Sequence, residues 1–310
     1  RIRVRAAWEN VIYDLFSGYV GSWDQEYPDV GRDATAVVRV TDGFAVLNLQ
    51  KLTDKQYDAV LSGFRVAAVL GDTSLATTPT IIEFGRSVMA ETGLLTDVSA
   101  LSHLQSVAES ENGSFFFSAA GEPTFQGRDH RILEERTAAG TIATTGGNVR
   151  YSGLTGRYDD SELWNEVRIT PFGGTAESAL GTASGTSYYT RTYARDFLIS
   201  SQNEAADAAF YLLGQFEEPA IRFDEVAVEG AVDPGNSWPL ILGSGISRRL
   251  AVTHITPNGG TVSSDQHVEG VSFSIAPRIF EASFRFSPAS VQNYGVWDVS
   301  KWDDGAKWGY

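Results

Sequence analysis

The sequence predicts a mainly β protein that carries an α+β insert. Short apolar or aromatic runs separated by turn residues fill both ends of the chain, which is the pattern of strands. Between them, apolar residues recur at helical spacing and lead into a hairpin with a Gly turn. A length of 310 residues exceeds one ordinary core, so at least two packing units are expected.

Residues 1–52 are expected to form a first β-barrel-like domain, which could be discontinuous in sequence. In RIRVRAAW the arginines alternate with Ile2 and Val4, which is the period of a half-buried strand. Four further runs indicate strands, at residues 11–16, 19–23, 36–40 and 44–47. Turn signals separate these runs at Ser17-Gly18, at residues 28–31 and at Asp42-Gly43.

Residues 53–137 form the predicted α+β insert. Thr53-Asp54-Lys55-Gln56 fits a capping box that opens a helix, which would stop at Gly71. After a strand at residues 80–84, a second helix would be capped by Thr96 or Asp97. It would end near Asn112-Gly113, where the glycine can take the left-handed conformation. A hairpin of residues 115–117 and 124–125 would follow.

Residues 138–290 form a predicted second β-barrel-like domain or twisted sheet with one long helix, at residues 204–216. The segments 137–156 and 175–187 are poor in large apolar residues and are expected to be loops. VEGVSFSIA and RIFEASFRF alternate and would pair across the turn Ala276-Pro277-Arg278. The other expected strands are residues 163–170, 221–228, 240–242 and 249–255.

The last twenty residues form a Trp-rich C-terminal extension, assigned as 291–310. So short a segment cannot build a core, so it is expected to dock against something. It could anchor a neighbouring subunit, stack on sugars or pack on its own chain. The candidate subunit-interface residues are Trp297, Trp302, Trp308 and Tyr310.

Composition excludes several kinds of site. The chain has no cysteine, so it forms neither disulfides nor thiolate metal sites. Its four histidines show no i, i+4 pair, although His254 and His267 could meet across a hairpin. Asp298, Asp303 and Asp304 lack EF-hand spacing, so no metal or cofactor is predicted.

The sequence contains no run of 18 apolar residues, so no membrane helix is predicted. The start at Arg1 indicates a processed or truncated product, or part of a longer chain.

The net charge of −15 argues against static binding of nucleic acid, which needs clustered cations. An acidic surface that lines a conduit would instead repel phosphate and let DNA slide. Solubility alone also accounts for the acidity.

No catalytic residue is predicted. Adjacent acids such as Glu134-Glu135 and Glu217-Glu218 would point to opposite faces of a strand, whereas glycosidases need two carboxylates that face each other. No G-x-S-x-G elbow and no P-loop lysine occur. A polysaccharide or peptidoglycan hydrolase assembled from distant acids, and a carbohydrate-binding module, remain alternatives.

In order and pattern, nearly the whole chain resembles the hub-type minor tail proteins of long-tailed bacteriophages. The matching segments are RIRVRAAW, YDLFSGYVGSWDQEYPD, DATAVVRVTDGFAVLN, FRVAAVL, SALSHLQSVAESENGSFFFSAAGEPTFQGR, LWNEVRIT and RDFLISSQNEAADAAFYLLGQFEEPAIRF. The Trp-rich extension and the segments 137–156 and 175–187 depart from the family pattern.

The resemblance implies two β-barrel-like tube (hub) domains with an inserted α+β part. It implies a structural virion protein, located at the tail tip and assembled in the bacterial host cytoplasm. Three copies would form a ring, the baseplate hub, with a channel for DNA ejection. The implied partners are the chain itself, the tail tube and distal tail proteins, and tip fibres or receptor-binding proteins.

Overall fold

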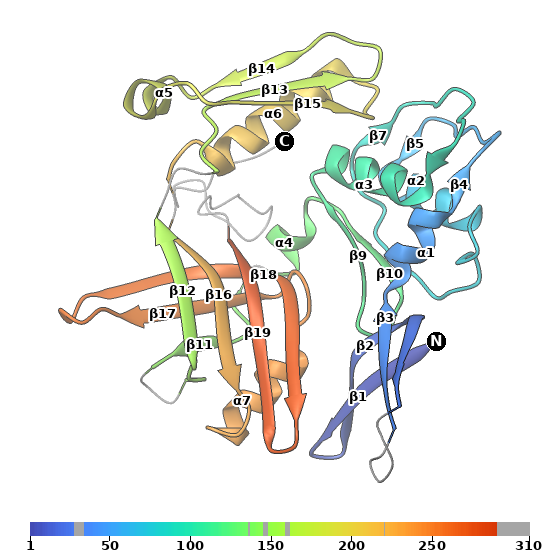
Figure 1. Cartoon of the computed structure of the whole chain (residues 1–310). Coiled ribbons are helices and arrows are strands. Elements are labelled where there is room, and N and C mark those ends of the chain that lie inside the picture. The colour runs from blue at the N-terminus through green and yellow to red at the C-terminus, as the bar shows by residue number, and fades with distance from the viewer. Residues whose placement is uncertain (28–33, 136, 145–147, 159–161, 220, 290–310) are drawn as a thin grey trace. The chain divides into compact units, whose positions relative to one another are not determined.

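The computed structural model describes residues 1–27, 34–135, 137–144, 148–158, 162–219 and 221–289. The fold is mainly β, as predicted, and divides into two compact units, Arg1–Gly127 and Arg128–Tyr310 (Figure 1). The finer division at residues 52, 137 and 290 stays a prediction. None of the described helices is long and apolar enough to cross a membrane.

The first unit opens with a three-stranded antiparallel sheet in the order β1-β2-β3. Its strands are β1 (Ile2–Trp8), β2 (Val11–Glu26) and β3 (Thr35–Thr41). The predicted turn at Ser17-Gly18 is wrong, because β2 runs straight through it. A Cβ atom on Gly18 would lie 2.4 Å from the carbonyl oxygen of Thr41, so the glycine permits a close approach of strands. The expected turn at residues 28–31 lies outside the described residues.

Two predictions for residues 42–61 are wrong. Helix α1 (Gly43–Leu49) replaces the strand expected at 44–47, because the side chain of Asp42 accepts a hydrogen bond from Phe44 N at 3.0 Å and caps a helix. The helix expected from the capping box at residue 53 begins later, as α2 (Ser62–Gly71), and ends at Gly71 as predicted. Asp54 has a φ of 55°, a left-handed conformation that a helix start does not allow. Strands β4 (Lys51–Leu52) and β5 (Val60–Leu61) lie in this region.

Helix α3 (Ala100–Glu111) confirms the second helix of the insert with changed ends. Ser99 caps its start in place of Thr96 or Asp97, and Asn112, with φ 54° and ψ 33°, takes the left-handed position predicted for Gly113. The predicted hairpin is confirmed as β9 (Ser114–Phe117) and β10 (Pro123–Gln126). The short strands are β6 (Ile81–Ile82), which pairs with β10, β7 (Val88–Met89), which pairs with β5, and β8 (Val98–Ser99), which pairs with β4.

The second unit contains a six-stranded mixed sheet in the order β11-β17-β18-β19-β16-β12. The edge strands β11 (Thr141–Ala143) and β12 (Gly153–Tyr158) form inside the segment expected to be a loop. They are stabilised by partners distant in sequence, since β11 pairs with β17 and β12 with β16. The inner strands are β16 (Ile221–Glu229), β17 (Arg249–Ile255), β18 (Thr261–Ala276) and β19 (Ile279–Pro288). The predicted β18–β19 hairpin is confirmed, with Ala276 opposite Ile279.

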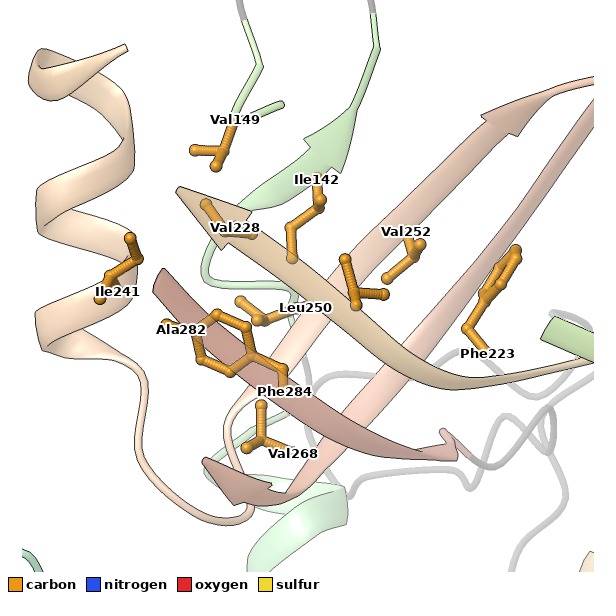
Figure 2. Close-up of a cluster of buried hydrophobic side chains, with 11 residues drawn as sticks. Ile142, Val149, Phe223, Val228, Ile241, Leu250, Val252, Val268, Ala282 and Phe284 are labelled. Atoms are coloured by element: carbon orange, nitrogen blue, oxygen red, sulfur yellow. The ribbon is translucent and has the colours of Figure 1, made fainter. Parts of the chain in front are cut away.

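The core of the second unit forms on one face of this sheet. Figure 2 shows apolar side chains from the strands and from helix α7 (Pro234–Gly243) converging on one cluster. Ile241 of α7 covers the strands, so the strand predicted at 240–242 is wrong. Pro234 stands at the start of this helix, where the missing N–H costs nothing. A short helix, α4 (His130–Leu133), lies at the start of the unit.

A second layer of the same unit packs a long helix on a three-stranded sheet in the order β14-β13-β15. The strands are β13 (Glu166–Pro171), β14 (Glu177–Leu180) and β15 (Thr192–Phe197). Helix α6 (Gln202–Phe216) confirms the predicted helix and buries Ala205, Ala208, Ala209, Leu212 and Leu213. The segment 175–187 is not the expected loop, because it contains β14 and helix α5 (Thr182–Tyr188).

Candidate interaction surfaces

The described residues contain no group of three or more His, Asp or Glu side chains that could hold a metal ion. His254 and His267 do not meet across the hairpin, which the sequence left open, because they lie at opposite ends of the β17–β18 ladder. His254 Nδ1 lies 2.7 Å from Tyr151 Oη, and His267 Nδ1 lies 3.0 Å from the carbonyl oxygen of Ser247. Both imidazoles therefore have partners within the second unit.

Among the acidic doublets, Glu134-Glu135 has a structural partner in the described chain. Glu135 of the Glu134-Glu135 doublet pairs with Arg248 at 3.2 Å and also accepts a hydrogen bond from Arg249 N. That carboxylate therefore holds the chain after α4 against the start of β17. Asp159-Asp160 and Asp303-Asp304 lie outside the described residues, as do Asp298 and the four candidate interface residues Trp297, Trp302, Trp308 and Tyr310. The interface assignment of these four stays a prediction.

The N-terminal sheet exposes apolar side chains on both faces. Directly paired residues of an antiparallel sheet share a face, and neighbours along a strand point to opposite faces. Trp23 pairs with Val38, whereas Val37 pairs with Asp24, so Trp23 and Val37 lie on opposite faces. They are 59% and 58% exposed. A sheet of a monomer normally hides one face, so large apolar side chains exposed on opposite faces are an unusual feature of this sheet.

The same sheet also leaves strand edges without a partner among the described residues. The first half of β2 pairs with β1 and the second half pairs with β3. Each half therefore has one ladder, and its other edge carries N–H and C=O groups that a further strand could bind. Charged side chains are spread over the sheet in ion pairs, Arg5 with Asp14 at 2.6 Å and Arg39 with Asp24 at 2.9 Å.

The β14-β13-β15 sheet presents an open face opposite α6. On the covered face Val167, Ile169 and Ala179 are buried. The alternate residues carry a polar network, in which Glu166 accepts hydrogen bonds from Arg168 at 2.6 Å and from the hydroxyl of Thr192. This face is mostly polar, although Glu166 itself is buried and its cross-strand neighbour Leu180 is exposed, a mixture typical of a solvated sheet surface or the rim of an interface.

Two buried polar clusters stabilise the interiors of the two units. In the first unit, Arg65 is fully buried, lies over the ring of Tyr57 at 5.5 Å and donates to the carbonyl oxygens of Asp58 and Ala90. His103 stacks on the same tyrosine. Burial, followed by the charge of Arg65, lowers the pKa of His103 to about 4.

In the second unit, Arg131 of α4 forms a two-pronged ion pair with Glu269, at 2.6 and 2.9 Å. Burial opposes ionisation of Glu269, but the hydrogen bond and the charge of Arg131 bring its pKa below the usual value. Burial lowers the pKa of the neighbouring His267 to about 4, and Arg131 adds to that shift. These groups hold α4 to strands β18 and β19, which is a structural role.

A pocket of about 330 Å³ lies between α7 and the outer edge of β11. Sequence reasoning could not find it, because residues 234–243 were expected to include a strand. Its residues come from 139–141, 148–149, one face of α7 and Arg248.

The sequence matches no protein-family model and no curated protein. Solved structures nevertheless share its fold. The tail protein from Neisseria meningitidis MC58 is 10% identical, and the match covers 92% of this chain and 83% of that one with a TM-score of 0.63. The 43 kDa tail protein of prophage MuSo2 from Shewanella oneidensis is 15% identical, over 89% and 78% of the two chains, with a TM-score of 0.59.

Prophage tail protein gp18 from Listeria monocytogenes EGD-e is 10% identical, over 90% of this chain and 80% of that chain, with a TM-score of 0.52. At these identities the likeness establishes a common fold, and it spans both units of the chain.

Proposed function

We propose that this chain is a structural protein of a long-tailed bacteriophage virion, and specifically the hub of the tail tip or baseplate. The observation that carries the proposal is the fold, which is shared with tail proteins over 92% of the chain. The order of sequence segments that resembles minor tail hub proteins supports the same role independently of the structure comparison.

The N-terminal sheet supports an assembled state. Its apolar residues on two faces and its open strand edges are surfaces that a monomer would leave in water. Copies that contact one another through two different patches close into a ring when the rotation between them allows it. In our proposal three copies close such a ring, and the barrel-like tube domains line it. Distal tail and tube proteins contact one end, and tip fibres or receptor-binding proteins contact the other.

The proposed ring surrounds a channel through which DNA leaves the virion. The net charge of −15 suits such a wall, because acidic side chains repel the phosphate backbone and keep DNA from binding statically. The proposal assigns no enzymatic reaction to the chain and no cofactor.

Imaging of the intact particle, together with mass measurement of the purified chain, tests the proposal. The expected result is a threefold ring around a pore at the tail tip. A chain that stays monomeric with its tail neighbours, and is absent from the tip of the particle, would refute it. A basic channel wall in the imaged ring would refute the role of the acidic charge and leave the ring itself intact.

A further inference from the structure

The sequence contains two Asn-Gly pairs, Asn112-Gly113 and Asn258-Gly259, and the structure places them in different surroundings. An asparagine followed by a glycine is chemically reactive, because the backbone nitrogen of the glycine can attack the side-chain amide carbon of the asparagine. Glycine has no Cβ, so its nitrogen is unshielded and the chain bends easily into the cyclic product. Whether the attack occurs therefore depends on how the fold holds each pair.

Asn258-Gly259 lies in the turn that joins β17 to β18 (Figure 1). Asn258, Gly259 and Gly260 are all exposed. Gly259 has a φ of 84°, a left-handed conformation that glycine adopts without strain. A Cβ on this glycine would meet nothing within 4 Å, so the described chain leaves space around the turn. Water can reach both the side chain and the backbone of this pair.

Hydrogen bonds hold the side chain of Asn258 against the backbone that follows it. Its Oδ1 accepts a weak hydrogen bond from Gly260 N at 3.4 Å and another from the hydroxyl of Thr256. That hydroxyl shares its single proton with the carbonyl oxygen of Gly260, 2.9 Å away. Since the amide oxygen bonds to the second residue along the chain, the amide carbon lies close to the nitrogen of the first, Gly259. Both donors also stabilise the negative charge that develops on Oδ1 during the attack.

The hydrogen bond of the attacking nitrogen belongs to the same exposed turn. Gly259 N donates to Thr256 O at 2.9 Å and has to leave this bond before it reacts. Exposed turns open locally at a small cost in free energy, while the sheet behind them stays folded. The reaction at Asn258 therefore needs only a local opening of the turn.

Asn112-Gly113 is protected by packing. Asn112 ends helix α3 with φ 54° and ψ 33°, and Gly113 N donates to Ala108 O at 2.9 Å. A Cβ on Gly113 would lie 2.3 Å from the carbonyl oxygen of Gln126, so strand β10 packs directly against this glycine. The side-chain nitrogen of Asn112, which would leave as ammonia, is buried. Attack at this pair requires the end of α3 to separate from β10.

We propose that Asn258 is a site of spontaneous deamidation, whereas Asn112 stays intact in the folded protein. The nitrogen of Gly259 forms a bond to the amide carbon of Asn258, and the bond from that carbon to Nδ2 breaks. The proton of Gly259 N leaves with Nδ2 as ammonia. Water then adds to one carbonyl carbon of the cyclic imide and opens the ring to aspartate or isoaspartate.

The net reaction consumes one water molecule, releases one ammonia and oxidises nothing. It adds one negative charge to the turn between β17 and β18. This inference does not depend on the proposed tail role, and its failure would leave that role untouched.

Peptide mass spectrometry of the full chain, after incubation at mildly alkaline pH, tests the proposal. The Asn258 peptide of the folded protein should convert to the acid at least about tenfold faster than the Asn112 peptide. In guanidinium chloride the two rates should become similar, because both asparagines precede glycine and packing no longer protects either. Equal rates in the folded protein would overturn the proposal. So would an Asn258 that reacts only in the unfolded chain.

Thr256→Val tests the contribution of the hydroxyl. It removes one donor from Oδ1 of Asn258, so deamidation should slow about fivefold, the rate equivalent of one hydrogen bond. Thr261→Val removes an exposed hydroxyl at the other end of the same turn and is the matched control, whose rate should not change. Denaturant unfolding checks that both variants fold. Equal rates in the two variants would overturn the role assigned to the Thr256 hydroxyl.

Discussion

At the scale of single residues, buried ionisable groups distinguish this protein from a simple apolar core. His103 in the first unit and His267 in the second are nearly inaccessible to water, and each lies near an arginine. Both histidines therefore stay neutral inside the fold at a pH where an unfolded chain would protonate them.

Acid should destabilise both units through these two histidines. Their pKa is about 4 in the fold and 6.5 in an ordinary environment, so the unfolded chain binds more protons between these values. Stability is complete above pH 6.5 and falls as the pH drops towards 4. The loss is at most about 3 kcal/mol for each histidine. Denaturant unfolding at a series of pH values from 7 to 4 measures it.

His103→Gln should flatten the pH dependence of the first unit and His267→Gln that of the second. Ser102→Gln, on the exposed face of α3, is the matched control and should change neither. An unaltered pH profile in both histidine variants would show that other groups cause the acid sensitivity.

The Arg131–Glu269 pair should contribute more than the pairs on the N-terminal sheet. Arg131→Leu removes both hydrogen bonds from a half-buried carboxylate, so we expect a loss of about 1–2 kcal/mol in the unfolding free energy of the second unit. Arg39→Leu breaks the more exposed pair with Asp24 and should cost about 0.5 kcal/mol or less. Equal costs, measured in urea, would contradict this ranking.

At the scale of elements, the sequence predicted best the helices and strands whose own residues follow one periodic pattern over a long stretch. Helix α6 and the β18–β19 hairpin have many residues in a single clear period, so their local pattern agrees with their burial. Residues 44–47 have only a short apolar run, which fits a buried strand or a helix equally well. There, the capping bond of Asp42 decided the outcome.

Other elements could not be predicted because distant residues create them. Strands β4, β5 and β6 have two residues each and exist only through their pairing partners. Similarly, β11 and β12 have weak local patterns and are fixed by β17 and β16. The capping box at residue 53 fits a local rule, but Asp54 takes a left-handed conformation and the chain enters a helix only at Ser62.

In helix α2, glycine-to-alanine substitutions test whether helix propensity or tertiary packing has the larger effect on stability. Alanine normally stabilises a helix over glycine by about 1 kcal/mol. A Cβ on Gly63, however, would lie 1.9 Å from the carbonyl oxygen of Glu83, so Gly63→Ala should destabilise the first unit by about 1–3 kcal/mol. Gly71→Ala, where a Cβ meets nothing within 4 Å, should be neutral or stabilising. Chemical denaturation of both variants makes the comparison, and a stable Gly63→Ala protein would refute the close approach.

At the scale of the whole molecule, the chain combines well-packed interiors with an N-terminal sheet that exposes large apolar side chains among the described residues. The buried cores stabilise the fold of each unit, and the N-terminal sheet is the surface through which we expect copies to assemble. The sequence identified the strands of this sheet but not that its β2–β3 part exposes Trp23 and Val37 on opposite faces, because alternation predicts one buried face. The pocket beside α7 was also beyond sequence reasoning, since it depends on a helix that the pattern did not indicate.

Assembly should depend on Trp23. Trp23→Glu places a charge on the exposed face of the sheet, so the proposed ring should fail to form while the unfolding free energy changes by about 0.5 kcal/mol or less. Ser102→Gln should assemble normally. Light scattering gives the mass, and denaturant unfolding confirms that the fold is retained. A Trp23→Glu protein that still forms rings would exclude this face of the sheet from the contact between copies.

The positions of β11 and β12 at opposite edges of the large sheet have a consequence for synthesis on the ribosome. Thr141 of β11 pairs with Ala251 of β17, a residue that is made about 110 positions later. Both edge strands therefore leave the ribosome long before their partners exist. Sheets closed by such distant contacts form slowly, and their unpaired strands can aggregate meanwhile. The large sheet should thus be unable to fold until strands β17 to β19, in the last quarter of the chain, have been synthesised. A chain that stops before β17 should become a substrate for chaperones.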